Sequence, residues 1–186
     1  MKPEEKLLDL LVERSLSMLK ECSKAELDDI YLLSIYIEDE DGDVLPELRL
    51  GWNTNTQFKQ SLPKASSAKE AKWNYAFWIQ NEKDLMMGHK LRTSWMEDGG
   101  FYISPELYSS DEELWDQRYR ICTDALWNLG AKLGLRLRED TWFTEQFSVE
   151  IPIIVHEVHM DGSENGYVNM VNENGQAKEY LLGWWS

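Results

Sequence analysis

The chain has 186 residues and carries 19 lysines and arginines against 34 aspartates and glutamates, which gives a net charge of −15 and a pI near 4.6. A negative charge of this size disfavours binding to nucleic-acid phosphates and to anionic membrane surfaces, and it favours a basic protein partner. With 42% hydrophobic residues, the composition excludes a disordered chain and predicts one domain over residues 1–186.

The N-terminus and the two cysteines bear on the cellular compartment. No run of about 18 apolar residues occurs, and the opening stretch MKPEEKLLDLLVERS has acidic residues where a signal peptide has a basic head. We therefore expect a cytoplasmic protein. Cys22 and Cys122 each lie on an apolar helical stripe, which predicts buried, unreactive thiols and neither a disulfide nor a zinc site.

The first third of the chain predicts a helix followed by two strands. Apolar residues recur at spacings of three and four from Leu8 to Cys22, behind a helix-starting Pro3, and they predict a helix over roughly residues 4–26. The run IYLLSIYI (30–37) predicts a strand covered on both faces and therefore central in its sheet. EDEDGD (38–43) then supplies a turn, and VLPELRLGW (44–52) an antiparallel return strand.

The aromatic stretch EAKWNYAFWIQNE (70–82) permits two interpretations. Ser67 and Glu70 have the spacing of a capping box, which predicts a helix over about residues 68–81. The alternative is a strand with Trp73 and Tyr75 on one face. In a helix, Trp73 would pack on the sheet, whereas Tyr75 and Trp78 would point elsewhere and would need a second layer, a pocket or a partner.

The second half predicts one more long helix and further strands. Residues 82–108 are expected to be irregular with a short strand at 101–104, and a helix is expected over 111–133, ended by Gly134. Residues 149–160 and 167–171 are expected to be hairpin strands. The predicted fold class is therefore α+β, with a mostly antiparallel sheet packed against two long helices in a single pair of layers.

Three motifs approach a metal-site pattern without completing it. In EDEDGD, placing Gly42 at position six of a calcium loop puts Ile37 and Leu48 where carboxylates are needed. In DGSENGYVNMVN, Asn172 stands where the bidentate carboxylate should be, so a turn is preferred to a weak cation site. HEVH (156–159) is one residue short of a zinc-protease motif. We therefore predict no metal, no cofactor and no catalytic residues, although an enzyme is only unsupported and not excluded.

The order of elements also resembles a known family. The segments that carry the likeness are IYLLSIYIEDEDGD, WNTNT, EAKWNYAFW and DEELWDQRYRICTDALWNL, within residues 5–160. They resemble a bacterial family of small, acidic, stand-alone proteins catalogued as a domain of unknown function. Some members look like immunity proteins of toxin systems, so the resemblance implies protein binding, and it supplies no catalytic residue.

The leading functional hypothesis is a non-catalytic protein-binding module, in the manner of an immunity protein that neutralises a basic partner. One alternative is an enzyme or small-ligand binder with an aromatic-lined pocket built from Trp73, Trp78, Trp95 or Trp142. Another is a subunit of a larger assembly. No oligomeric state is predicted. Aromatic residues dominate binding hot spots and acidic ones steer a cationic partner, so the candidate binding residues are Tyr75, Trp78, Trp184, Trp185, Asp39, Asp41 and Asp43.

Overall fold

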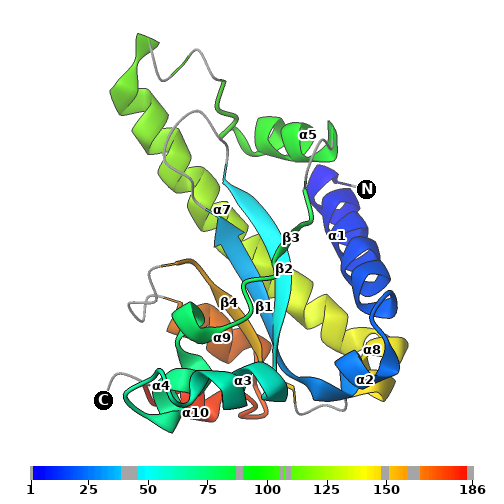
Figure 1. Ribbon diagram of the computed structural model, residues 1–186. Coiled ribbons are helices and arrows are strands. Elements are labelled where there is room, and N and C mark those ends of the chain that lie inside the picture. Colours follow the sequence, from blue (N-terminus) through cyan, green and yellow to red (C-terminus); the bar gives the residue numbers. More distant parts are fainter. Residues whose placement is uncertain are drawn as a thin grey trace.

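A computed structural model of the chain describes residues 2–38, 46–86, 90–104, 107, 110–147, 151–158 and 164–183. It has a four-stranded sheet in the order β3-β2-β1-β4 with helices on both faces (Figure 1). Within the described residues, no helix is both long enough and apolar enough to cross a bilayer. The predicted α+β class is confirmed.

The sheet is mixed, which corrects the expectation of a mostly antiparallel one. Strand β1 (Ile30–Glu38) is central, as predicted, and pairs antiparallel with β2 (Glu47–Thr54). The other neighbour of β1 is β4 (Ile153–His156), which runs parallel to it. The chain reaches β4 through the helices of residues 90–147, after it has formed the other strands, and parallel strands require a connection of this length. The two-residue strand β3 (Lys83–Asp84) pairs antiparallel with β2 at the far edge.

One face of the sheet carries the larger core. It is covered by α1 (Pro3–Lys20) and α7 (Glu112–Glu139), with α5 (Lys90–Gly99) and α8 (Thr141–Phe147) beside them. The expectation of only two long helices against the sheet is therefore wrong. Alternate residues of β1, such as Leu33 and Ile35, are fully buried against this layer. The predicted helix over 4–26 is divided, because Ser23 caps a separate helix, α2 (Lys24–Asp29), with its side chain accepting from the Glu26 amide.

Helix α7 runs past the residue that was expected to end it. Gly134 lies inside the helix, where a Cβ atom would stand only 2.6 Å from Val171 Cγ1. The glycine therefore permits close packing and is not a C-terminal cap. Cys122 on the same helix is buried as predicted, whereas Cys22 is only half-buried.

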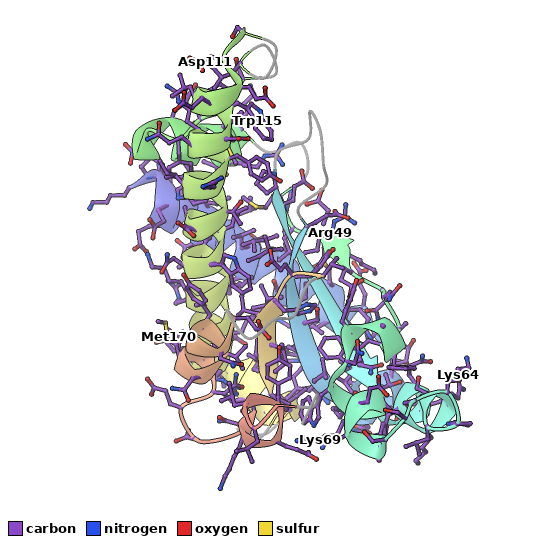
Figure 2. All side chains as sticks on the ribbon, turned by 90° about the vertical axis from the view of Figure 1, so that its left-hand side faces the viewer. Arg49, Lys64, Lys69, Asp111, Trp115 and Met170 are labelled. Atoms are coloured by element: carbon purple, nitrogen blue, oxygen red, sulfur yellow. The ribbon has the colours of Figure 1, made fainter. Side chains whose placement is uncertain are left out.

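The opposite face of the sheet carries a second, smaller core, so the fold is not a single pair of layers. Figure 2 shows α7 on one side of the sheet and the segment around Lys64 and Lys69 on the other. Leu32 and Ile154 point into this second core. The remaining elements are α3 (Asn55–Ser61), α4 (Ala68–Trp73), the short 3-10 helix η1 (Tyr75–Phe77), α9 (Asn165–Val171) and α10 (Lys178–Leu181). Helix α9 packs against α7 and contributes Val171 to the first core and Val168 to the second.

Three predicted elements of the second half are wrong. Residues 101–104 do not form a strand, and α5 is a helix within a segment expected to be irregular. Residues 167–171 belong to helix α9, not to a hairpin strand.

Helix α9 ends at the outer edge of β4, where the side chain of Asn172 bonds to the backbone of Ile153. Asn172 Oδ1 accepts a hydrogen bond from the Ile153 N–H at 3.0 Å, and Asn172 Nδ2 donates one to the Ile153 carbonyl at 2.7 Å. A single side chain thus takes the place of a neighbouring strand at this point.

Candidate functional site

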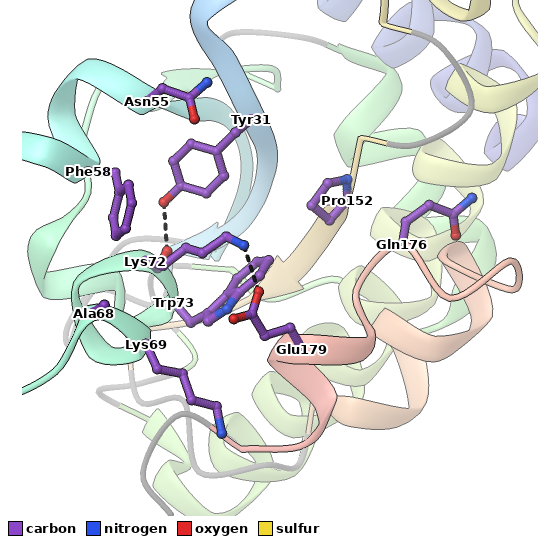
Figure 3. A pocket seen from close by; sticks show the side chains of 10 residues that line it. All are labelled: Tyr31, Asn55, Phe58, Ala68, Lys69, Lys72, Trp73, Pro152, Gln176 and Glu179. Atoms are coloured by element: carbon purple, nitrogen blue, oxygen red, sulfur yellow. Dashed lines mark hydrogen bonds and ion pairs between the residues drawn. The ribbon is translucent and has the colours of Figure 1, made fainter.

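A groove of about 500 Å³ opens on the second-core side of the molecule, where α3 and α4 approach the C-terminal segment (Figure 3). This volume falls within the range of small-ligand pockets. Its walls come from the start of β1, from α3 and α4, from the approach to β4 and from the residues around α10. The lining residues are Tyr31, Asn55, Phe58, Ala68, Lys69, Lys72, Trp73, Pro152, Gln176 and Glu179.

Three aromatic rings form the apolar part of the groove. Tyr31 makes edge-to-face contacts with Phe58, at 6.2 Å between centroids, and with Trp73, at 6.3 Å. Behind them, Trp73 contacts Tyr180 edge-on at 5.9 Å. Trp73 ends α4 and is only 2% exposed, so it is part of the second core as well as of the groove wall. Arrangements of this kind are favourable for aromatic pairs and fix the ring planes.

Hydrogen bonds hold the Tyr31 ring in place. The Tyr31 hydroxyl donates to the Lys72 carbonyl at 2.6 Å and accepts from Asn53 Nδ2 at 2.8 Å. The Trp78 indole N–H donates to the same Lys72 carbonyl at 3.0 Å. Burial raises the pKa of the Tyr31 phenol, so it stays neutral and keeps its proton for this bond. The groove wall is therefore pre-organised, which lowers the entropic cost of binding.

Local capping explains why α3 and α4 form where they do. Thr54 caps α3 by accepting from the Gln57 amide at 3.1 Å, and Ser67 caps α4 by accepting from the Glu70 amide at 3.1 Å. The Ser61 hydroxyl then ties α3 to the 3-10 helix by donating to the Phe77 carbonyl at 2.9 Å. Helix α4 stops at Trp73, so the helical interpretation of residues 68–81 is confirmed only for its first part.

Charged groups line one side of the groove. Lys72 Nζ lies 2.6 Å from Glu179 Oε2 and 4.6 Å from the centre of the Trp73 ring. Figure 3 shows the Lys72 side chain extending across the Trp73 ring toward Glu179, while Lys69 points away from that pair. Both partners of the ion pair remain partly open to solvent, with side-chain exposures of 33% for Lys72 and 53% for Glu179.

The groove lies against a basic stretch of an acidic chain. Residues 52–81 contain four lysines, one glutamate and no other charged side chain, a net of +3 that leaves −18 for the rest of the sequence. The lysines are Lys59, Lys64, Lys69 and Lys72. This local reversal of charge is a sequence signal that points to the groove, and none of the predicted binding residues rests on it.

The two candidate residues from the aromatic stretch meet in a different cluster. Tyr75 stacks on Tyr36 at 5.4 Å, and the rings of both surround His156 together with Trp78, at centroid distances of 5.0 to 5.4 Å. Trp78 is only 4% exposed, so it meets a second layer, whereas Tyr75 is half-buried. The remaining candidates Trp184, Trp185, Asp39, Asp41 and Asp43 lie outside the described residues.

His156 also forms a contact that resembles the pairing of a nucleophile with its base. Its Nε2 lies 2.8 Å from the Ser34 hydroxyl, and its Nδ1 lies 3.0 Å from the Glu157 carbonyl. Both side chains are buried, at 0% exposure for His156 and 1% for Ser34, so a substrate has no access to them in this arrangement. Burial lowers the pKa of the imidazole to about 4, which keeps it neutral. The pair is best explained as a satisfied polar contact beneath the aromatic cluster.

Across the described part of the chain, no three His, Cys, Asp or Glu side chains come together as a metal site would require. The loop residues of the two calcium-like motifs, and His159 of HEVH, lie largely outside that part. Comparison of the chain with protein-family models, with characterised proteins and with solved structures finds no match.

Proposed function

We propose that the protein is a non-catalytic protein-binding module and that a segment of its partner enters the groove between α4 and α10. The observation that carries this proposal is the groove itself, with the rings of Tyr31, Phe58 and Trp73 held in fixed positions beside accessible charge. Aromatic side chains in a pre-organised pocket are the usual anchors of protein interfaces.

The polar chemistry near the groove favours binding over catalysis. Catalysis by a nucleophile and a base needs both groups within reach of a substrate. The pair of Ser34 and His156, which resembles such an arrangement, is buried and lies under Tyr75 and Trp78. The groove contributes Lys72 and Glu179, which neutralise each other in an ion pair and are suited to recognition.

The charge distribution supports a partner that is basic overall. Outside residues 52–81 the chain has a net charge of −18, and a field of this sign accelerates encounter with a cationic protein. An immunity-type role, in which the module covers the site of a basic toxin, is one form that this binding would take.

A second candidate function is the binding of a small ligand. The observation that favours it is the groove volume of about 500 Å³, which suits a compact organic molecule. A metabolite mixture that shifts the Trp73 indole resonance, in the absence of any protein partner, would favour this candidate.

The test of the main proposal is affinity capture from native lysate with three baits. They are the unchanged protein, Phe58→Ala, which removes a ring from the groove, and Leu62→Ala, which removes an exposed apolar side chain (39% exposed) just outside it. We expect a protein that the unchanged bait and Leu62→Ala retain and that Phe58→Ala loses. Equal recovery with all three baits, or no specific protein with any of them, would refute the proposal.

A further inference from the structure

We infer that the groove recognises an acidic side chain of the partner, a glutamate or aspartate next to an aromatic residue, and that Glu179 of this chain occupies the acidic position when no partner is bound. The inference rests on the proposed function and adds the chemistry of the segment that enters. Lys72 is the group that would contact the incoming carboxylate, and the rings of Tyr31 and Phe58 would contact its aromatic neighbour.

Charge complementarity is the first reason. The partner is proposed to be basic overall, yet the groove lies against a stretch of this chain that carries a net positive charge, +3 over residues 52–81. A cationic segment would meet Lys69 and Lys72 there, and like charges placed together oppose binding. An acidic segment would meet complementary charge.

The position of Lys72 is the second reason. Its ammonium group lies 4.6 Å from the centre of the Trp73 ring and 2.6 Å from the Glu179 carboxylate. The ring holds the ammonium in place through a cation–π contact, while the Lys72 backbone carbonyl is fixed by Tyr31 and Trp78. The lysine is therefore aimed at the groove by contacts on both its side chain and its backbone.

Glu179 shows which chemistry this site accepts. Its carboxylate already forms an ion pair with Lys72. Glu179 belongs to α10, a helix of four residues (Lys178–Leu181) near the end of the described chain. An ion pair with one partner 53% exposed has little net stability, so a second carboxylate can replace it at low cost. Binding of the partner then competes with an internal contact, which reduces the apparent affinity by the fraction of Lys72 that Glu179 occupies.

The test uses two matched peptides and four forms of the full chain. The peptides are N-acetyl-Glu-Phe-amide and N-acetyl-Gln-Phe-amide, which differ only in the side-chain charge. The proteins are the unchanged chain, Lys72→Gln, Glu179→Gln and, as a charge-matched control outside the groove, Lys64→Gln. Binding is followed by the ¹H–¹⁵N resonance of the Trp73 indole, and unshifted resonances elsewhere show that each variant is folded.

We expect the Glu peptide to bind about five times more tightly than the Gln peptide, because a charge-assisted hydrogen bond is roughly twice as strong as a neutral one. Lys72→Gln should abolish that preference, Glu179→Gln should tighten binding of the Glu peptide about threefold, and Lys64→Gln should leave it unchanged. N-acetyl-Gln-Phe with a free C-terminus provides a further comparison.

Equal binding of the two amide peptides, or no gain from Glu179→Gln, would overturn the inference, as would a preference for the free C-terminus alone. These outcomes are separable from failure of the proposed function. If Phe58→Ala loses the captured partner but the two peptides bind equally, the groove is a binding site that does not select an acidic side chain. If Phe58→Ala retains the partner as well as the unchanged protein does, the proposed function itself fails.

Discussion

The buried histidine beneath the aromatic cluster makes the stability of the fold depend on pH in a way that can be calculated. A carbonyl can only accept, so His156 Nδ1 carries the proton that is donated to Glu157, and Nε2 accepts from the Ser34 hydroxyl at 2.8 Å. Protonation of Nε2 would remove that acceptor and place a charge in a fully buried site. The informative perturbation is His156→Gln, which offers an amide acceptor and donor and does not titrate.

The size of the effect follows from the two pKa values. Burial lowers the pKa of His156 from its ordinary 6.5 to about 4 in the folded state. Between these values the unfolded chain binds more protons than the folded one, so stability is complete above pH 6.5 and is lost as pH falls toward 4. Linkage gives a loss of about 2 kcal/mol between pH 7 and pH 5 and about 3 kcal/mol in full below pH 4.

Urea unfolding followed by tryptophan fluorescence at pH 7 and pH 5 measures this loss. Other groups titrate in the same range: burial raises the pKa of Glu47 and Glu82 in the folded state, which adds stability as pH falls. Because both proteins contain these carboxyls, the difference between the unchanged chain and His156→Gln isolates the histidine. We expect the unchanged protein to lose about 2 kcal/mol more than the variant over this interval. Parallel pH profiles for the two proteins would refute the reasoning.

Further predictions concern packing and buried hydrogen bonds, all measured as changes in the free energy of unfolding. Gly134→Ala should destabilise by about 1–2 kcal/mol, because its Cβ would lie 2.6 Å from the stiff side chain of Val171 and the strain exceeds the gain in helix propensity; a neutral or stabilising result would show that the helix shifts freely. Gly166→Ala, in α9 with nothing within 4 Å of its Cβ, is the matched control and should stabilise by about 0.5 kcal/mol. Asn172→Ala should cost about 3 kcal/mol, since it leaves the amide and carbonyl of Ile153 unsatisfied in a buried position; a loss below about 1 kcal/mol would mean that water replaces the side chain.

The first half of the fold could be predicted from the sequence because the residues that specify each element lie within that element or next to it. The run IYLLSIYI is apolar on both faces, and β1 has a core on each side. The spacing of Ser67 and Glu70 marked the start of α4, and the Ser67 side chain accepts from the Glu70 amide as expected. In each case the residues that specify the element are neighbours in the chain.

The second half was predicted poorly because tertiary contacts override local preference. The segment YVNMV (167–171) has high β-propensity, yet it is helical, with Val168 and Val171 buried at a spacing of three. Gly134 was interpreted as a helix end, but its role is to let α7 approach Val171. The contact with Val171 cannot be inferred from the sequence around the glycine.

The groove could not be predicted for the same reason. Its walls bring together Tyr31, Phe58, Trp73, Pro152 and Glu179, which are spread over most of the chain. Trp73, which the ligand-binding alternative places in a pocket, does line the groove. The excess of lysine over residues 52–81 was the only local indication of a site there.

The central claim is that the groove is the binding site, and the dissociation constant of the captured partner tests it most directly. With the purified partner, titration calorimetry compares the unchanged protein, Phe58→Ala and the control Leu62→Ala. Loss of an aromatic anchor at the centre of an interface typically costs more than 1 kcal/mol. We therefore predict at least a fivefold weaker dissociation constant for Phe58→Ala and an unchanged one for Leu62→Ala. The same dissociation constant for all three proteins would contradict the claim.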